Sequence, residues 1–385
     1  MCDDLVAIGD SRICTEYPTE ILYCAECCTA HQRFQIPKKK LFPSTYHYRA
    51  HLTADVLNGM EALVKSCEIR LGNCAGMTVL DVGCNDGSLL DLFRNRNAIT
   101  AGIEPTDASH EATRKGHFVL NTFFDRDAAA KILKAHGKPD IISFTNVFAH
   151  IEHLNDVADS LRLLMSENTV VVIENHYLGA ILDRNQFDTF YHEHPRTYSY
   201  TSFEYIARSL GVEVLEVEFP SRYGGNIRVY LGNRGKFVSE STLDRDELAS
   251  REKTFRSAFT KLQSNMRTWR EATKTAIVDN VRRNGRLRAK GFPGRAAILV
   301  TLLGLDEGLL SAVYEKPGSM KIGHYVPGTR VPIYSDDELF CLADKTQPLL
   351  NFAWHISGEI RAYLKAHGYA GPIIDILDPK TFDVA

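Results

Sequence analysis

The stretch TVLDVGCNDGSLLDLF, residues 78–93, has the pattern of a buried strand, a turn that contains glycine, and a helix. Gly83 and Gly87 allow the backbone to approach a ligand closely, and the helix that follows points its N-terminus at that ligand. A dinucleotide site would carry Gly-x-Gly-x-x-Gly directly after the strand, and this stretch lacks it. The turn therefore predicts a site for a ligand of another kind.

Acidic and amide side chains distinguish this turn. Asp81, Asn85 and Asp86 suit a cationic amino group, such as that of a methionine moiety, and would repel a pyrophosphate. Glu104 ends the next predicted strand, in AGIEP, where its carboxylate is placed to accept hydrogen bonds from two ribose hydroxyls. This combination resembles the class I S-adenosylmethionine-dependent methyltransferases. The resemblance implies that S-adenosylmethionine is the cofactor and that its site is formed by Asp81, Gly83, Asn85, Asp86, Gly87, Glu104 and Asn146.

The segment around the turn alternates apolar runs with helical patterns. Helical patterns such as SLLDLFRN and DVADSLRLLM separate the runs, so parallel strands with crossover helices are the natural arrangement. Two further runs, VEVLEVEF and NIRVYLG, are joined by SRYGG and predict a hairpin that adds an antiparallel edge. The sequence thus predicts an α/β fold with a Rossmann-like core, whose first strands are expected at residues 78–83, 99–105, 140–147 and 169–175.

A long helical stretch separates this core from a second α/β pattern. Residues 244–284 contain no Pro or Gly, and their apolar side chains recur at steps of three and four, as on one face of a helix. RLRAKGFPGRAAILVTLLG, LLSAVYE, PLLNFAWHI and GPIIDIL then repeat the alternation of strands and helices. We therefore expect three regions, at about residues 1–60, 61–240 and 241–385.

The composition of the chain limits the classes of partner. Its 385 residues include 45 basic and 48 acidic ones, for a net charge of −3, which disfavours a nucleic-acid polymer or an anionic membrane. The start, MCDDLVAIGDSR, has aspartates where a signal peptide would have a basic end and an apolar run. No stretch approaches the roughly 20 apolar residues of a membrane helix. We expect a cytoplasmic protein, and the sequence does not indicate its oligomeric state.

Further blocks narrow the resemblance. TNVFAHIEHLND, QFDTFYHEHPRTYSYTS and YGGNIRVYLGN occur in this order, and GHYVPGTRVPI and FAWHISGEI follow. Over nearly the whole chain they resemble the sugar C-methyltransferases that act on nucleotide-linked keto-deoxysugars. The resemblance implies a small zinc-binding N-terminal region (1–60), a methyltransferase core (61–240) and a second, C-terminal Rossmann-like α/β domain (241–385). It also implies that the last domain helps to hold the nucleotide part of the substrate.

The block YHEH provides residue types that carbon methylation needs. Methylating carbon requires a carbanion equivalent, which an enolate beside a ketone supplies, and histidine titrates near neutrality and can accept the α-proton. By resemblance, His194 is the base or its partner, with Tyr191 and Glu193 beside it. His150, at the end of the strand in NVFAH, reaches the same edge of the sheet, as the competing base or an enolate stabiliser.

The conformation of this block can also be predicted. Pro195 disfavours helix at His194, so we expect an extended loop. In an extended chain His192 and His194 face one way and Glu193 faces the other. That geometry is also compatible with a metal site or with an ordinary polar surface loop.

The resemblance also indicates residues that bind the substrate. Tyr46 and Tyr48, in STYHYRAH, lie where the family has an active-site tyrosine, and both are candidates. Arg196 stands where family members usually have an aromatic residue, and it is a candidate to pair with an anionic group of the substrate or, alternatively, a solvated loop residue. Lys321 and Tyr325, before PGT, are candidates to contact a diphosphate.

A cysteine cluster near the start suggests a structural zinc ion. Cys24-x-x-Cys27 is typical of half a zinc site, and Cys2 and Cys14 are candidates for the second pair that the family has upstream. Four thiolates would close a tetrahedral site without an open position, so the zinc would be structural. The alternatives are substitute ligands, namely Cys28 and His31, or free thiols of a decayed site.

The sequence therefore predicts an S-adenosylmethionine-dependent C-methyltransferase that acts on a nucleotide-linked keto-deoxysugar through a histidine-generated enolate. One alternative is methyl transfer to oxygen or nitrogen of a related sugar or small metabolite, in which the histidines would deprotonate a hydroxyl or an amine. A second alternative is a sugar-nucleotide-binding protein without turnover.

Overall fold

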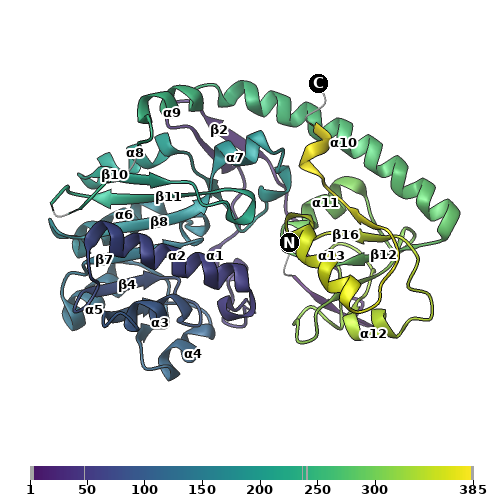
Figure 1. Ribbon diagram of the computed structural model, residues 1–385, viewed down its shortest axis with the longest axis horizontal. Helices are drawn as coiled ribbons and strands as arrows, with labels where there is room; N and C mark the ends of the chain where they lie inside the picture. Colours follow the sequence, from purple (N-terminus) through teal and green to yellow (C-terminus); the bar gives the residue numbers. More distant parts are fainter. Residues whose placement is uncertain (1–3, 47, 236, 240–241, 383–385) are drawn as a thin grey trace.

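The computed structural model describes residues 4–46, 48–235, 237–239 and 242–382. Its largest sheet has seven strands in the order β10-β11-β8-β7-β4-β5-β6. Figure 1 shows β10, β11, β8, β7 and β4 one below another. These strands are β4 (Thr78–Val82), β5 (Ile99–Ile103), β6 (Phe118–Leu120), β7 (Ile141–Thr145), β8 (Val170–His176), β10 (Glu213–Glu218) and β11 (Asn226–Gly232).

Five strands of this sheet, from β6 to β8, are parallel, and β11 is antiparallel to both of its neighbours. The central strands β4 and β7 are buried on both faces, which explains their continuous apolar sequences. The strand order changes direction at β4, with β5 on one side and β7 on the other. Ligands of such sheets bind outside the carboxyl ends at this point. The predicted Rossmann-like core with an antiparallel edge is confirmed.

Helices cover both faces of the sheet. Neighbouring residues of β4 point to opposite faces of the sheet. Val79 packs with α2 (Ala54–Leu71) and α3 (Ser88–Arg94), whereas Leu80 packs with α5 (Arg126–His136) and α6 (Leu154–Leu164). The helices of this part are α1 (Lys38–Leu41), α2 (Ala54–Leu71), α3 (Ser88–Arg94), α4 (Ala108–Arg114), α5 (Arg126–His136), α6 (Leu154–Leu164), α7 (Leu178–Asp183) and α8 (Tyr200–Leu210).

Two helices connect the core to the C-terminal region, where the sequence predicted one over 244–284. They are α9 (Arg245–Glu252) and α10 (Phe255–Asn284), and α10 runs along both regions (Figure 1). The break follows Glu252, whose buried carboxylate accepts hydrogen bonds from the Tyr177 hydroxyl at 2.9 Å and the Tyr200 backbone N–H at 2.8 Å. The predicted apolar stripe of α10 is present, and its buried side chains are Phe255, Leu262, Trp269 and Ile277.

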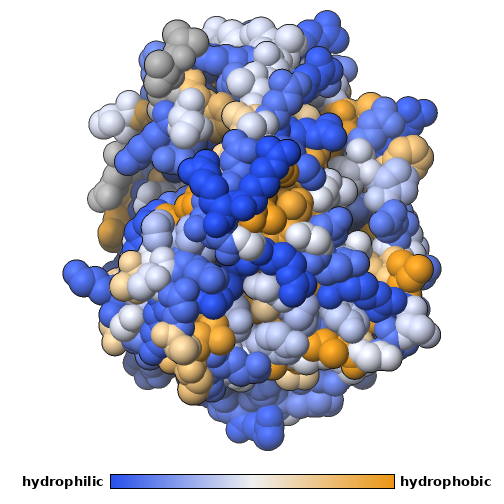
Figure 2. Space-filling model, turned by 90° about the vertical axis from the view of Figure 1, so that its right-hand side faces the viewer, coloured by the Kyte–Doolittle hydropathy of each residue, from blue (hydrophilic) through white to orange (hydrophobic). Residues whose placement is uncertain are grey.

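The C-terminal region contains a second sheet of five parallel strands, in the order β15-β13-β12-β16-β17. The predicted second α/β region is thereby confirmed. The outward face of the molecule on this side is mostly hydrophilic, with apolar residues in a few separate groups (Figure 2). The elements are β12 (Leu287–Lys290), β13 (Leu310–Glu315), β15 (Ile333–Ser335), β16 (Leu349–Asn351), β17 (Ile373–Asp375), α11 (Ala296–Leu303), α12 (Asp336–Cys341) and α13 (Ser357–Ala366).

The N-terminal strands pair with both other regions. β2 (Ile21–Cys24) and β3 (Thr29–Gln32) form a sheet with β9 (Arg196–Thr197), and β1 (Val6–Ala7) pairs with β14 (His324–Tyr325). α2 crosses the predicted boundary at residue 60, and the division into three regions stays a prediction. Among the described residues, no helix has both the length and the apolar character needed to cross a membrane.

Candidate active site

A cavity of about 460 Å³ lies at the carboxyl edge of the seven-stranded sheet. The turns after β4, β5, β7 and β8 contribute to its wall, and so does the C-terminal region. Among the predicted site residues, those on the wall are Tyr46, Tyr48, Gly83, Asn85, Glu104, Asn146, His150, Tyr191, Glu193, His194 and Lys321.

The turn after β4 has the backbone conformation that its glycines predict. Gly83, Asn85 and Gly87 have φ angles of +74°, +50° and +79°, in the left-handed region that glycine and asparagine tolerate best. A Cβ atom at Gly83 would lie 2.5 Å from Cγ2 of Val147, so a larger residue would clash with the side chain of Val147. Gly87 lies behind the wall and starts α3.

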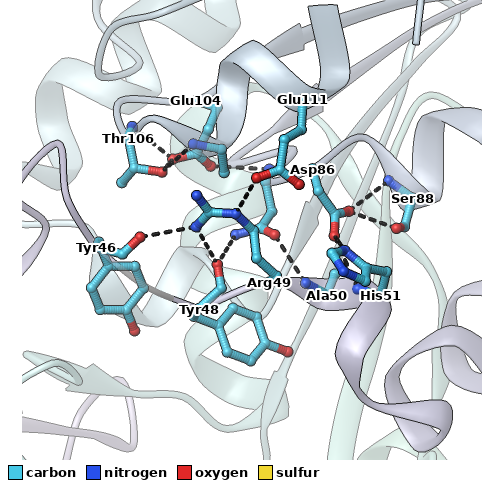
Figure 3. A network of polar contacts seen from close by, with 12 residues as sticks. Tyr46, Tyr48, Arg49, Ala50, His51, Asp86, Ser88, Glu104, Thr106 and Glu111 are labelled. Atoms are coloured by element: carbon cyan, nitrogen blue, oxygen red, sulfur yellow. Dashed lines mark hydrogen bonds and ion pairs between the residues drawn. The ribbon is translucent and has the colours of Figure 1, made fainter. Parts of the chain in front are cut away.

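Glu104 lies directly after β5 with its carboxylate at the cavity wall. One carboxylate oxygen accepts from the Asn85 backbone N–H at 3.0 Å, and the other accepts from the backbone N–H and hydroxyl of Thr106 at 2.9 and 2.7 Å (Figure 3). These bonds fix the carboxylate in one orientation. A carboxylate oxygen can accept more than one hydrogen bond, so Glu104 can still receive the hydroxyls of a ribose.

Two predicted cofactor ligands lie behind the wall instead. Asp81 is buried in β4 and accepts from the Ser143 hydroxyl at 2.7 Å, and burial raises the pKa of its carboxyl group to about 7. Asp86 is fully buried and accepts from the hydroxyl of Ser88 at 2.6 Å and from Nδ1 of His51 at 2.6 Å. Asp86 therefore stabilises the turn after β4 and attaches the segment that precedes α2 to this turn.

Two tyrosines before α2, Tyr46 and Tyr48, lie at the cavity wall. Asn85 accepts from the Ala50 N–H at 3.0 Å and donates to the Tyr48 carbonyl at 3.1 Å (Figure 3). Arg49 donates to the carbonyl of Tyr46 at 3.0 Å and pairs with a carboxylate on α4. The hydroxyl of Tyr46 donates to Glu193 at 3.3 Å, so this tyrosine joins the cofactor side of the cavity to the YHEH block.

Three histidines from three elements meet in the cavity. The ring of His194 lies 5.0 Å from that of His150, which belongs to η2 (Phe148–His150), and 5.1 Å from that of His176 at the end of β8. The ring of Tyr191 lies 4.3 Å from His194. In the described part of the chain, Nδ1 of His150 is buried without a hydrogen-bond partner.

Burial determines the charge of this cluster. It lowers the pKa of His150 to about 4 and that of His176 to about 3, and it holds the pKa of His194 well below its usual range, with further contributions from His150 and His176. Nδ1 of His194 lies 3.2 Å from the carbonyl of Thr189, which can only accept, so Nδ1 carries the proton. Nε2 of His194 is therefore free to act as a base.

The YHEH block is not extended, and the prediction of its conformation was wrong. It forms a tight turn, in which the His194 N–H donates to the Tyr191 carbonyl at 2.9 Å. Glu193 and His194 consequently both line the cavity. His192 faces the N-terminal segment, where its Nε2 lies 3.1 Å from the Tyr17 carbonyl. Pro195 disfavours a helical conformation only at His194, the residue before it. It does not prevent His192 and Glu193 from forming the centre of a turn.

The other predicted substrate residues lie in three different places. Lys321 lines the cavity and donates to the Phe292 carbonyl at 2.5 Å. Arg196 instead donates to the Ile151 carbonyl at 2.7 Å and supports η2 from behind. Tyr325 belongs to β14, away from the cavity, and accepts from the Gly9 N–H at 3.3 Å.

Several polar residues of the cavity wall were not among the predicted site residues, for example Lys38, His176, Tyr223, Arg295 and His355. His176 directly follows the run TVVVIEN, so the strand-end rule that selected His150 could have found it. Arg295 and His355 reach the cavity from the C-terminal region, and no local pattern places them there. Burial lowers the pKa of His355 to about 3, with a further contribution from the Arg295 guanidinium.

The predicted zinc ligands do not form one group among the described residues. Cys24 and Cys27 interact in the turn between β2 and β3, whereas Cys14 is buried next to the backbone of Gly328 in the C-terminal region. Cys2 lies outside the described residues. Within these residues, a group of three or more possible metal ligands occurs only at His51, Asp86 and Glu111. The zinc site stays a prediction.

Comparison with known proteins agrees with this geometry. Residues 50–217 match the family described as a methyltransferase domain, and residues 221–373 match the C-methyltransferase C-terminal domain. The chain is therefore an S-adenosylmethionine-dependent methyltransferase. The match of its C-terminal region to that of the C-methyltransferases supports the predicted C-methyltransferase family. The C-methyltransferase NovU of Streptomyces niveus is 26% identical over 357 residues, which span 90% of this chain and 82% of that protein.

Two solved methyltransferase structures each cover 46% of this chain. The magnesium protoporphyrin IX methyltransferase of Synechocystis PCC 6803, with bound S-adenosylmethionine, is 13% identical and covers 46% of this chain and 80% of its own, with a TM-score of 0.35. A SAM-dependent methyltransferase from Archaeoglobus fulgidus is 15% identical and covers 46% of this chain and 93% of its own, with a TM-score of 0.37.

The cavity wall fits S-adenosylmethionine. Gly83 has no side chain, so the backbone of the turn after β4 lies at the cavity wall. The fixed carboxylate of Glu104 stands at the end of β5, where a ribose can be held. Asn85 and Asn146, both with positive φ, complete this part of the wall.

Proposed function

We propose that this C-methyltransferase methylates a carbon atom beside the ketone of a nucleotide-linked deoxysugar, and that His194 removes the proton from that carbon. The position of His194 carries this proposal. It is buried in the cavity that the cofactor turn also lines, Nδ1 is held by the Thr189 carbonyl, and Nε2 is left to accept a proton. Because its pKa is lowered, His194 is neutral at pH 7 and is present as the base.

The chain's own task is to generate the enolate. When bound, S-adenosylmethionine supplies an electrophilic methyl group. Nε2 of His194 accepts the α-proton, the carbon–hydrogen bond breaks, and its electron pair passes toward the ketone oxygen. The proton then leaves His194 for solvent. Tyr46 and Glu193, joined by their 3.3 Å hydrogen bond, stand beside the base and suit a sugar hydroxyl. His150, with its unpartnered Nδ1, is the competing base.

Two lysines support an anionic, activated sugar as the substrate. Lys321 and Lys38 both line the cavity, and Lys321 uses one of its three N–H donors on Phe292. Ammonium groups of this kind suit a diphosphate. The cavity volume of about 460 Å³ is within the usual range of about 300–1,000 Å³ for ligand sites. In this proposal, residues 61–240 hold the cofactor and residues 241–385 hold the nucleotide.

Solvent exchange tests the proposal. The protein is incubated in heavy water with a nucleotide-linked 4-keto-6-deoxyhexose, without S-adenosylmethionine, and the ring protons are followed by NMR. We expect the proton next to the ketone to exchange, and His194→Asn to abolish the exchange. His192→Asn is the matched control, because His192 belongs to the same turn but faces the N-terminal segment.

Each outcome has a definite meaning. If S-adenosylmethionine and the nucleotide-linked sugar both bind but no proton exchanges, the enolate route is contradicted. Methyl transfer to oxygen or nitrogen then becomes the better interpretation. If exchange persists in His194→Asn but is lost in His150→Asn, the role of base passes to His150.

A further inference from the structure

A buried ion pair joins the two α/β regions next to the active site. Asp188, in η3 (Phe187–Thr189), is fully buried, and both of its oxygens are bound by the C-terminal region. Arg295 donates through Nε at 2.8 Å and through Nη2 at 2.6 Å, and the indole N–H of Trp354 donates at 2.8 Å. A buried carboxylate is costly unless it is paired in this way. The position of η3 therefore depends on Arg295.

The same short helix holds the proposed base. Thr189 directly follows Asp188, and its carbonyl accepts the Nδ1 proton of His194 at 3.2 Å. Because η3 has only three residues, fixing the carboxylate of Asp188 also fixes the Thr189 carbonyl. Gln186, just before η3, strengthens this connection: its side chain accepts from Arg295 at 3.3 Å and donates to the Gly224 carbonyl at 2.8 Å.

We infer that Arg295 and Asp188 are a positioning pair, through which the C-terminal region sets the orientation and the protonation state of His194. The inference rests on the proposed function, because it takes His194 to be the base. It assigns to the C-terminal region a part in catalysis besides substrate binding.

The charge of Arg295 provides a measurable consequence. The groups that face His194 are His150 from η2, His176 from β8, Tyr191 and Glu193 from its own turn, and Arg295 from the C-terminal region. Burial lowers the pKa of His194 most, His150 and His176 lower it further, and the Arg295 cation adds a smaller contribution in the same direction. Removing the cation should raise the pKa of His194. Removing the Asp188 anion leaves the cation uncompensated and should lower the pKa of His194 further.

Three variants separate these effects. Arg295→Leu removes the cation, Asp188→Asn removes the anion, and the double variant removes both charges without leaving either one buried alone. Since the double variant contains no unpaired buried charge, it keeps the test valid if a single variant does not fold. Arg361→Leu is the matched control, because Arg361 also forms an ion pair, with Asp375 at 2.8 Å, but lies on the exposed face of α13 away from the cavity.

The first measurement does not depend on turnover. The ring of His194 is titrated by NMR in histidine-labelled protein, and its signal is identified by its loss in His194→Asn. We expect His194 to titrate at higher pH in Arg295→Leu than in the wild type, at the same or lower pH in Asp188→Asn, and near the wild-type value in the double variant. Shifts in one direction for both single variants, or no shift in Arg295→Leu, would overturn the inference.

The second measurement is the exchange of the substrate α-proton. Misplacement of a reacting group by about 1 Å can cost about 10²-fold in rate, so we expect all three variants to lose about ten- to a hundredfold, with Arg361→Leu unchanged. Wild-type rates in the double variant would show that the pair does not position the base. If the wild type itself does not exchange, the proposed function fails, and the titrations alone decide whether the pair controls His194.

Discussion

The neutral histidine cluster predicts that acid destabilises this protein in a specific way. In the folded state the pKa of His150 is about 4 and that of His176 is about 3, both lowered by burial. In the unfolded chain the pKa of both histidines should be about 6.5. As the pH falls below 6.5, the unfolded chain therefore binds protons that the folded chain does not, and the free energy of unfolding decreases. The loss continues until the pH reaches the folded-state pKa values.

The size of the effect follows from these values. A histidine with a pKa of about 4 when folded and about 6.5 when unfolded contributes about 2 kcal/mol less stability at pH 5 than at pH 7. A folded-state pKa of about 3 gives nearly the same loss over this range. The two histidines together should cost about 4 kcal/mol, which is large against a typical total stability of about 5–15 kcal/mol.

Urea unfolding followed by circular dichroism at pH 7 and pH 5 measures this loss. The variant that combines His150→Asn and His176→Asn should lose about 4 kcal/mol less between the two pH values than the wild type does. His110→Asn, which changes an exposed histidine, should keep the wild-type pH dependence. If the double variant is as sensitive to acid as the wild type, these two histidines are not held neutral by burial, and the argument for a neutral base loses its support.

Two further predictions concern the two sides of the cavity. Gly83→Ala places a Cβ atom 2.5 Å from Cγ2 of Val147, so the turn at the cavity wall must shift away from its cofactor-binding position. A loss of about 1–2 kcal/mol of binding free energy corresponds to S-adenosylmethionine binding about five- to thirtyfold more weakly in calorimetry. Gly76→Ala, with a similar φ but open space, should not change binding, and an equal loss there would refute the argument. Tyr46→Phe removes the hydrogen bond to Glu193 and should lower kcat about tenfold. If the affinity for S-adenosylmethionine fell together with kcat in Tyr46→Phe, Tyr46 would instead be a residue that binds the cofactor.

Much of the fold is determined by local sequence pattern. The fully buried strands β4 and β7 appear as apolar runs because both of their faces pack against helices, and the left-handed turn after β4 is marked by Gly83 and Gly87. Strand-end positions also located His150. By contrast, β6 has three residues, too few for a periodic pattern, and the break before α10 depends on the contacts of Glu252 with distant residues.

The site itself was recognised only in part. The YHEH block and the tyrosines before α2 could be connected to it by resemblance, but the directions of their side chains could not. Whether His192 or Glu193 faces the cavity depends on one hydrogen bond that closes the turn. Asp81 and Asp86 carry the acidic pattern of the cofactor turn, yet they bind Ser143 and His51 behind its wall.

The sequence by itself determined the order of strands and helices, the glycine turn and the type of chemistry at the carboxyl edge, because steric preference and hydrophobic periodicity act between near neighbours in the chain. The tertiary structure alone decided which distant groups meet. Asp188 and Arg295 are 107 residues apart, and Cys14 lies next to the backbone of Gly328, which is distant from it in sequence. Such pairings follow from the packing of one region against another, since a buried charge or thiol is stabilised by whichever groups the folded chain brings into contact with it.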